Sequence, residues 1–221
     1  MYNIAIDGPA GAGKSTIAKM AAKKLDFIYV DTGAMYRAMA LYFLNEGIDA
    51  SDAGAIGKAC DDIEISIAYE EGQQKVLLNG EDVTGRIRDE KVGNMASVTS
   101  AYGCVREKLV ALQRKLAARE NVIMDGRDIG TVVLPDATVK IFLTAAPEAR
   151  ARRRWLEYQQ KGMEVAFEDV LADVKQRDYQ DTHRAAAPLK QAEDAVLLDT
   201  SDLNFEQSLA AMKKIIAEKV N

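Results

Sequence analysis

Short runs of consecutive apolar residues recur along the chain. They occupy residues 2–7, 27–30, 122–124, 139–143 and 195–198. Apolar side chains on consecutive positions are typical of strands that are buried on both faces of a parallel sheet. The pattern therefore predicts five short strands in the interior of the protein.

Apolar side chains at helical spacing follow the first two of these runs and recur before the third. They predict a helix from about residue 14 to 25, a second over about 35–44 that Gly47 closes, and a third over about 101–119. Strands that alternate with helices predict an α/β fold, a doubly wound parallel sheet flanked by helices. In such folds ligands bind at the carboxyl ends of the strands.

One stretch breaks this alternation. Residues 63–69 alternate apolar with polar side chains, residues 70–74 form a turn, and residues 75–78 are again strand-like. Asn79-Gly80 is a strong hairpin signal before a third short strand at 81–84. The pattern predicts a small antiparallel meander inserted into the parallel core. We expect this lobe to hinge against the core.

Composition excludes several functional classes. The 221 residues are 48% hydrophobic and 29% charged, and the formal net charge is −5. Proteins that bind nucleic acids or membrane surfaces usually carry a basic excess, so neither partner is expected. No window approaches the ~18 to 20 apolar residues of a membrane span, and the chain opens on a strand without a leader pattern. We expect a cytoplasmic protein, and a monomer because no helix carries a sustained heptad seam.

The two cysteines, Cys60 and Cys104, have a spacing that suits neither a disulfide framework nor a metal site. The single histidine, His183, cannot complete a metal site with them. We expect both cysteines to be reduced packing residues.

A phosphate-binding motif lies between the first predicted strand and the first predicted helix. Residues 8–15 read Gly-Pro-Ala-Gly-Ala-Gly-Lys-Ser and match G-x-x-x-x-G-K-[ST]. The glycines let successive backbone N–H groups turn toward one anion, and the helix that begins there adds a favourable dipole. Lys14 can reach the β- and γ-phosphates, and Ser15 offers its hydroxyl to Mg²⁺. The motif predicts a nucleoside triphosphate ligand, and the alternative is a chance Gly/Ala-rich turn.

Arginines supply the further cations that phosphoryl transfer needs, because the guanidinium fork matches phosphate oxygens. Arg177 and Arg184 lie seven residues apart with Asp181 between them, which predicts one shared helical face. Arg37 and Arg127 lie near predicted strand ends, and Arg106 lies on the predicted helix after the meander. A separate cluster contains Arg150, Arg152, Arg153 and Arg154. For any one of these arginines taken alone, an exposed surface position is the competing interpretation.

Four segments carry a resemblance to a known family. They are residues 6–16, residues 31–37, residues 125–133, and the group Arg177-Asp178, Asp181, Arg184 and Ala187-Pro188-Leu189. With them the chain resembles the bacterial cytidylate kinases, nucleoside monophosphate kinases of the P-loop class, over essentially its whole length. The first segment occurs in many P-loop proteins, whereas the second and third together are specific to this family. The inserted meander is the family's monophosphate-binding elaboration.

The resemblance implies transfer of the γ-phosphoryl group of ATP to CMP or dCMP, with Mg²⁺ as cofactor. It implies one nucleoside monophosphate kinase domain over residues 1–221. Its core spans about 1–60 and 120–221, its monophosphate-binding insert about 61–100, and its mobile arginine-rich lid about 148–165.

The resemblance also assigns roles to individual residues. Those implied as catalytic are Lys14, Arg127 and Arg177. Those implied as ATP-binding are Gly8, Pro9, Ala10, Gly11, Ala12, Gly13, Lys14, Ser15, Thr16, Arg153 and Arg154, and Ser15 is also the implied metal ligand. Those implied as binding the acceptor nucleotide are Thr32, Arg37, Ser97, Arg106, Arg127, Asp128, Arg177, Asp181 and Arg184. Which arginine of the lid cluster contacts the triphosphate stays open.

Three positions keep a second interpretation. Asp128 could be a turn-capping aspartate, as could Asp125, and Ser97 could be a simple helix-surface serine. Before Val105 and Arg106 the family commonly shows a proline, whereas this chain has residues 102–104, Tyr-Gly-Cys. This departure puts the start of the following helix in doubt.

Competing functions also remain. A kinase of UMP, AMP or shikimate is the nearest, although a shikimate kinase would not need the meander. A GTP-binding switch would need a D-x-x-G element and an N-K-x-D guanine reader. Residues 82–85 match the former inside the predicted meander, but no asparagine is followed by lysine.

Overall fold

The structure, a computed structural model, describes residues 1–71 and 73–220. These residues form two compact units. The first unit comprises residue 1 and residues 28–121, and the second comprises residues 2–27 together with the chain from residue 122 onward. Residue 72, which falls in the predicted turn at 70–74, and residue 221 lie outside the described residues.

The second unit is built on parallel strands, as the apolar runs predict. Within this unit the strands pair in the order β6-β1-β7-β8, and all three pairings are parallel. Burial explains the runs, because Ile4, Ala5 and Ile6 of β1 are 0% exposed. The bounds of these strands are β1 Asn3–Asp7, β6 Val122–Gly126, β7 Val139–Thr144 and β8 Val196–Asp199.

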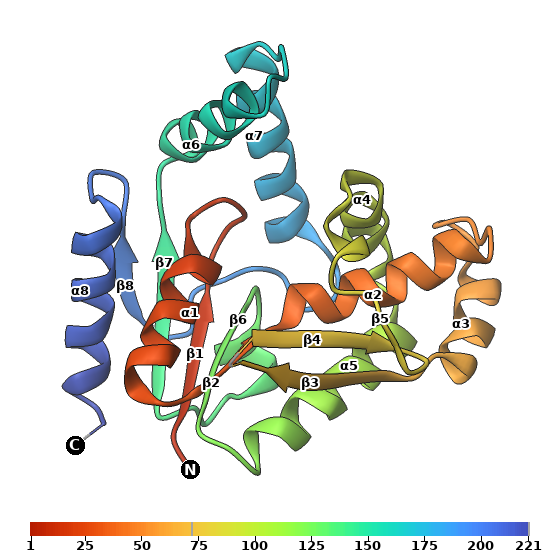
Figure 1. Cartoon of the computed structure of the whole chain (residues 1–221), viewed down its shortest axis with the longest axis horizontal. Coiled ribbons are helices and arrows are strands. Elements are labelled where there is room, and N and C mark those ends of the chain that lie inside the picture. The colour runs from red at the N-terminus through yellow and green to blue at the C-terminus, as the bar shows by residue number, and fades with distance from the viewer. Residues whose placement is uncertain (72, 221) are drawn as a thin grey trace. The chain divides into compact units, whose positions relative to one another are not determined.

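Two helices of this unit pack on each other, α1 (Lys14–Leu25) and α8 (Phe205–Ala217) (Figure 1). The spacing of apolar residues predicts α1 correctly, whereas α8 was not anticipated. Helix α8 begins with a capping box, in which the side chains of Asn204 and Gln207 each accept the other's backbone N–H. Within the described residues no helix is long and apolar enough to cross a membrane.

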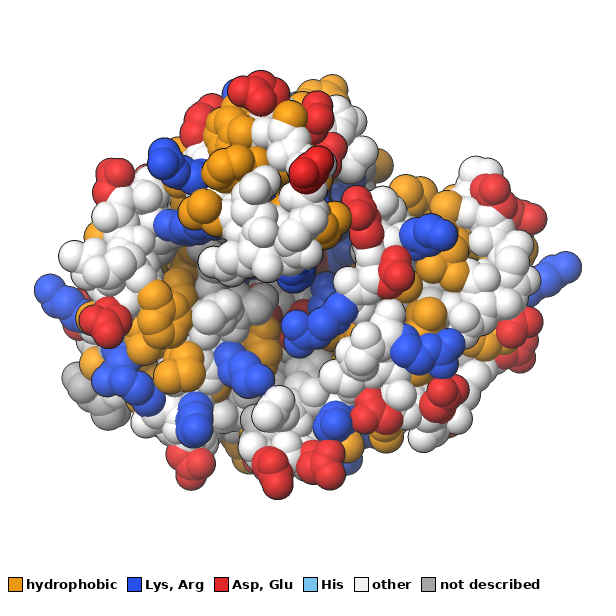
Figure 2. Space-filling model, turned by 45° about the horizontal axis from the view of Figure 1, so that its top comes forward, with side chains coloured by type: hydrophobic (Ala, Val, Ile, Leu, Met, Phe, Trp, Pro, Cys, Tyr) orange, Lys and Arg blue, Asp and Glu red, His pale blue; other side chains and the backbone are white. Residues whose placement is uncertain are grey.

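Helices α6 (Pro147–Gln160) and α7 (Phe167–His183) form a separate pair in the second unit (Figure 1). Their contact is apolar and centres on Ala151, Val170 and Val174. Figure 2 shows hydrophobic and acidic side chains together at the outer end of this pair. Residues 148–165, which were predicted as the lid, lie in α6 and in the segment that follows it.

The prediction that Arg177 and Arg184 share one helical face is wrong, because Arg184 lies beyond the last residue of the helix. Helix α7 ends at His183, and Arg184 caps it with extended backbone, at φ −62° and ψ 141°. The chain then turns back on the helix, because the Leu189 N–H donates to the Asp181 carbonyl at 2.8 Å. Pro188 lies in this returning segment and cannot donate a helical hydrogen bond.

The first unit contains the predicted antiparallel meander. Strand β3 (Ile65–Glu70) pairs with β4 (Gln73–Leu78), and β4 pairs with β5 (Glu81–Asp82). Asn79 and Gly80 both have positive φ, 49° and 84°, as the hairpin signal predicts. The last strand is shorter than predicted, because beyond Asp82 the Thr84 hydroxyl accepts from the Val76 N–H.

The rest of the first unit consists of one strand and several helices. Strand β2 (Ile28–Asp31) leads into α2 (Thr32–Asn45), followed by α3 (Ala53–Asp62), the 3₁₀ turn η1 (Arg86–Arg88), α4 (Glu90–Thr99) and α5 (Gly103–Ala117). The apolar spacing predicts α2 and α5 but not α3 or α4. Helix α5 begins after an extended Tyr102, so the helix forms without the family's proline.

Candidate active site

The loop between β1 and α1 has the backbone that the phosphate-binding motif requires. Gly11 and Gly13 have φ of 74° and 87°, in the left-handed region that favours glycine. A side chain at Gly8 would meet the Leu143 carbonyl oxygen at 1.9 Å, so only glycine fits beside β7. A backbone with these left-handed turns lets successive N–H groups point toward one anion.

Lys14 is almost fully buried beneath this loop. It is 5% exposed, and its Nζ donates to the Pro9 carbonyl at 2.7 Å. Burial, together with the nearby charge of Arg127, lowers the pKa of Lys14 to about 7. The carboxylates of Asp125, Asp7 and Asp181 act in the opposite direction. An anionic phosphate beside Nζ would likewise favour the ammonium form.

Ser15 is paired with a carboxylate that the sequence analysis considered only as a turn cap. Its hydroxyl donates to Asp125 Oδ2 at 2.7 Å, and Asp125 is 4% exposed at the end of β6. A hydroxyl and a carboxylate are oxygen ligands of the kind that Mg²⁺ takes beside substrate phosphates and water. The described residues contain no cluster of three or more His, Cys, Asp or Glu side chains able to hold a metal. The Ser15 hydroxyl and the Asp125 carboxylate are by themselves a donor pair that fits an Mg²⁺ bound together with phosphates.

Asp7, the last residue of β1, is a second carboxylate that the sequence analysis missed. It is 4% exposed and accepts the N–H groups of Ile129 and Gly130, both at 2.7 Å. Burial raises the pKa of Asp7 to about 6, although these two N–H groups oppose the rise. The two bonds fix the start of the π-helical turn η2 (Ile129–Val133), which directly follows Arg127 and Asp128.

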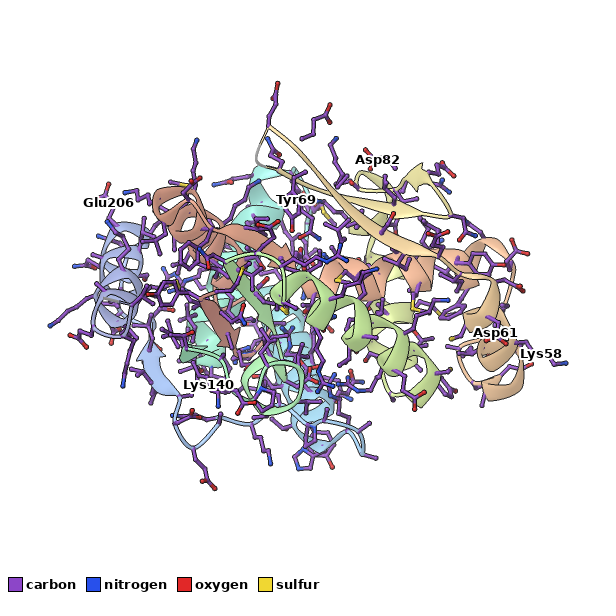
Figure 3. All side chains as sticks on the ribbon, turned by 90° about the horizontal axis from the view of Figure 1, so that it is seen from below. Lys58, Asp61, Tyr69, Asp82, Lys140 and Glu206 are labelled. Atoms are coloured by element: carbon purple, nitrogen blue, oxygen red, sulfur yellow. The ribbon has the colours of Figure 1, made fainter. Side chains whose placement is uncertain are left out.

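Gly130 allows two neighbours to lie close to the turn. A side chain there would meet Lys140 Cδ at 3.1 Å and Asp7 Oδ2 at 3.3 Å. Lys140, labelled in Figure 3, is 9% exposed on β7. It forms an ion pair with Asp194 at 2.8 Å. Glycine therefore lets the turn lie close to side chains of two neighbouring strands, β1 and β7.

Predicted acceptor-side residues of the second unit meet in one charged cluster. Arg127 Nε donates to Asp181 Oδ2 at 2.7 Å, and Arg184 Nη2 lies 3.5 Å from Asp128 Oδ1. Burial would raise the pKa of Asp181, but the positive charges of Arg127, Arg177 and Arg184 together lower it. Asp128 and Asp181 are 5% and 8% exposed. Four candidate residues from two distant segments therefore share one network.

The arginines of the lid cluster have different partners. Arg153 Nη2 donates to the Thr200 carbonyl at 2.6 Å. Arg154 Nε donates to the Tyr158 hydroxyl at 2.7 Å, and its guanidinium lies over that ring. Arg150 is 3% exposed and forms a bidentate ion pair with Asp178. Arg150 is therefore engaged within the protein.

A cavity of about 240 Å³ lies beside the phosphate loop and collects the predicted ATP-side arginines. Its lining residues are Ala10, Gly11, Arg150, Arg153, Arg154, Glu157, Tyr158, Val174 and Arg177. A larger cavity, about 370 Å³, has a mainly apolar lining that includes Phe142, Pro147 and Leu189. Its arginine is Arg150, already paired with Asp178. The smaller cavity is the better match to a polyphosphate.

The remaining acceptor-side candidates lie in the first unit, and two of them lie in the first two turns of α2. Thr32 is 3% exposed at the start of this helix. Arg37 Nη2 pairs with Asp31 Oδ2 at 3.1 Å, and Asp31 also caps the helix by accepting the Ala34 N–H. Among the described residues the buried Arg37 Nε has no hydrogen-bond partner. Arg37 therefore keeps donor capacity for an anion.

The meander holds this helix start in place. Gln74 of β4 accepts the Asp31 N–H through Oε1 at 2.8 Å and donates to the Asp31 carbonyl through Nε2 at 3.3 Å. The other two candidates are Ser97, half-buried on α4, and Arg106, 8% exposed on α5. Each unit therefore presents its own group of candidate residues.

Comparison with known proteins gives a consistent result. A family model described as "Cytidylate kinase" matches residues 4–218. A protein of Caldicellulosiruptor saccharolyticus named cytidylate kinase is 54% identical over 207 residues, 94% of this chain and 92% of its own. One from Carboxydothermus hydrogenoformans with the same name is 50% identical over 216 residues, 98% of this chain and 97% of its own.

Solved structures support the fold. The crystal structure of a shikimate kinase from Bacteroides thetaiotaomicron has a TM-score of 0.50 to this chain, with 14% identity and 98% coverage of each chain. An uncharacterised protein from Eubacterium ventriosum has a TM-score of 0.54, with 12% identity and coverage of 98% of this chain and 99% of its own. At these identities the likeness concerns the fold alone.

Proposed function

We propose that this chain, which belongs to the cytidylate kinase family, transfers the γ-phosphoryl group of ATP to CMP or dCMP through the residues of its phosphate loop and arginine network. As a member of that family it is a phosphotransferase. The observation that carries the residue assignment is the second unit's arrangement. A phosphate loop, a buried lysine, a hydroxyl–carboxylate pair and an arginine network lie on one set of strand ends.

ATP binds at the phosphate loop in this proposal. Backbone N–H groups of residues 8–16 surround the β-phosphate, and Lys14 neutralises charge that develops on the transferred group. Arg153 and Arg154 bind the triphosphate from the cavity beside the loop. Arg150 does not, because it is buried and paired with Asp178.

Ser15 and Asp125 would hold Mg²⁺ when it arrives with ATP. Their oxygens are 2.7 Å apart, close enough for both to contact one ion. When bound, the ion would supply positive charge that neutralises the phosphates. The protein residues supply the position.

In this proposal the acceptor nucleotide is bound by an arginine group and a carboxylate of the second unit. Arg127, Arg177 and Arg184 neutralise its phosphate, and Asp128 accepts the exocyclic amine of cytosine. The family resemblance also assigns acceptor contacts to Thr32, Arg37, Ser97 and Arg106. No covalent nucleophile is needed, because positioning and charge neutralisation supply most of the rate in phosphoryl transfer.

We also propose that the lid over residues 148–165 and the insert over about 61–100 move about the core during the cycle. The chain acts as a monomer in the cytoplasm, and its partners are ATP and CMP or dCMP.

The acceptor is tested by measuring ADP release from ATP and Mg²⁺ with CMP, dCMP, UMP, AMP and shikimate in turn. We expect CMP and dCMP to give the highest kcat/KM. A preference for AMP or shikimate would refute the proposal. Residues 82–85, which match a GTPase element, belong to the antiparallel meander and its turn, where Thr84 bonds Val76 and Asp82. A GTP-binding switch is tested separately, by measuring hydrolysis of GTP with no acceptor added.

A further inference from the structure

The two cysteines of the chain meet in the first unit although 44 positions separate them. Cys60 lies near the end of α3 and Cys104 in the first turn of α5, and their Sγ atoms are 3.3 Å apart. Both are free thiols. The helices α3 and α5 pack side by side, as Figures 1 and 3 show, with Lys58 and Asp61 of α3 labelled in Figure 3. Packing alone does not require two thiols to face each other at this contact.

The two thiols differ in their access to solvent. Cys60 is 5% exposed, whereas Cys104 is partly exposed. Burial and the neighbouring Cys104 together raise the pKa of Cys60 to about 12. A thiol with this environment reacts slowly with reagents in solution. An oxidant therefore meets Cys104 first.

A lysine lies against the same contact. Lys108, one turn after Cys104 on α5, donates from Nζ to the Cys60 carbonyl at 2.6 Å. Its charge lowers the pKa of Cys60, in opposition to the effect of burial. The contact thus holds the carboxyl end of α3 against α5 and favours the thiolate form of Cys60 during reaction.

We propose that Cys60 and Cys104 form a redox-modification site, at which a disulfide-class oxidant converts the facing thiols into a disulfide between α3 and α5. The sulfur atoms need to close only from 3.3 Å to the bond length of about 2.05 Å.

The reaction has two exchange steps. The Cys104 thiolate attacks one sulfur of the oxidant, forms a mixed disulfide and releases one thiolate. The Cys60 thiolate then attacks Cys104 Sγ, forms the internal disulfide and releases the second thiolate. The two cysteine protons pass to solvent or to the released thiolates. The two thiols are oxidised by two electrons in total, and the oxidant's disulfide is reduced to two thiols.

The resulting bond would tie the first turn of α5 to α3. Arg106 lies two residues beyond Cys104 on this helix, so the bond would restrict the segment that carries it. Such a constraint would also close a long loop of the unfolded chain and so favour the folded state.

The full-length protein, reduced and then equilibrated in glutathione buffers of increasing oxidised fraction, tests the site. Intact-mass measurement after acid quenching should show loss of two hydrogen masses in the wild type, with a peptide map linking Cys60 to Cys104. Cys60→Ala should instead accumulate one glutathione at Cys104, and Cys104→Ala should react much more slowly. Stable glutathione adducts, disulfide-linked dimers or unreacted thiols in the wild type would each overturn the proposal. These covalent readouts do not depend on which acceptor nucleotide the enzyme uses.

Discussion

Arg150→Ala removes a buried guanidinium that joins three segments of the second unit. Its Nε donates to the Ala145 carbonyl at 2.8 Å, and its Nη1 donates to the Ala10 carbonyl at 3.1 Å. Nη1 and Nη2 also donate to the two carboxylate oxygens of Asp178, at 2.8 Å and 2.5 Å. The substitution therefore leaves a carboxylate and two carbonyls without this partner, one of them in the phosphate loop.

The geometry sets the size of the effect. Breaking one partner of a buried ion pair costs about 3–5 kcal/mol. The Asp178 side chain is 25% exposed, so water recovers part of the loss and the lower end of the range, about 3 kcal/mol, applies. For a protein of this size 1 kcal/mol lowers Tm by about 2–4 °C, so we expect a fall of about 6–12 °C.

Urea unfolding and thermal melting measure this cost. Arg152→Ala is the matched control, because Arg152 is exposed on the same helix and should change stability by less than about 0.5 kcal/mol. Arg150→Lys keeps the charge but cannot make the same fork, so it should fall between alanine and wild type. If Arg150→Ala and Arg152→Ala have equal effects, the structural role assigned to Arg150 is wrong.

Three further substitutions test the site. Lys14→Met should lower kcat by roughly 10³ or more, yet raise Tm of the nucleotide-free protein at pH 6. The pKa of Lys14 falls on folding, so the cost of burying its charge is fully present below about pH 7 and fades toward pH 10. The gain in Tm should therefore vanish near pH 10. Full activity of the variant, or an equal gain in Tm at every pH, would contradict the role assigned to Lys14. Asp125→Asn keeps an acceptor for the Ser15 hydroxyl but loses the charge, so half-maximal activity should need at least about tenfold more Mg²⁺; an unchanged Mg²⁺ titration would exclude Asp125 as a ligand. Asp128→Ala should cost about 1.5–3 kcal/mol for CMP and much less for UMP, and so narrow the ratio of their kcat/KM values by about ten- to a hundredfold; an unchanged ratio places base reading elsewhere.

The parts of the fold that follow from local rules were predictable. The loop from Gly8 to Gly13 needs positive φ at fixed positions, and glycine at those positions is visible in the sequence. The hairpin at Asn79 and Gly80 and the stripe of α5 are also local patterns. Helices α3 and α4 were missed, although Asp52 and Asp89 cap them, because both are short and follow irregular segments.

The unpredicted site residues depend on contacts between distant segments. Asp7 bonds backbone groups 122 and 123 positions away, and Asp125 bonds Ser15 across 110 positions. Both carboxylates lie in segments that carry the family resemblance, but neither was assigned a role in the site. The sequence does contain a signal for these two residues, because each aspartate lies at the end of an apolar strand. The carboxyl ends of parallel strands meet at one edge of the sheet, so the two side chains are expected at the ligand site. Arg150 was grouped with its neighbours because sequence spacing does not report which arginine turns inward.

The arrangement around Lys14 explains why this unit retains charges that weaken its stability. Burying an ammonium and the carboxylates of Asp7 and Asp125 disfavours the folded state, as the shifted pKa values of Lys14 and Asp7 indicate. The same burial fixes the charges before a nucleotide arrives, so little reorganisation is needed as negative charge moves during phosphoryl transfer. A polyphosphate would bring to Lys14 the negative charge that its surroundings only partly supply. An apolar replacement of Lys14 would therefore make a more stable unit and a poorer catalyst.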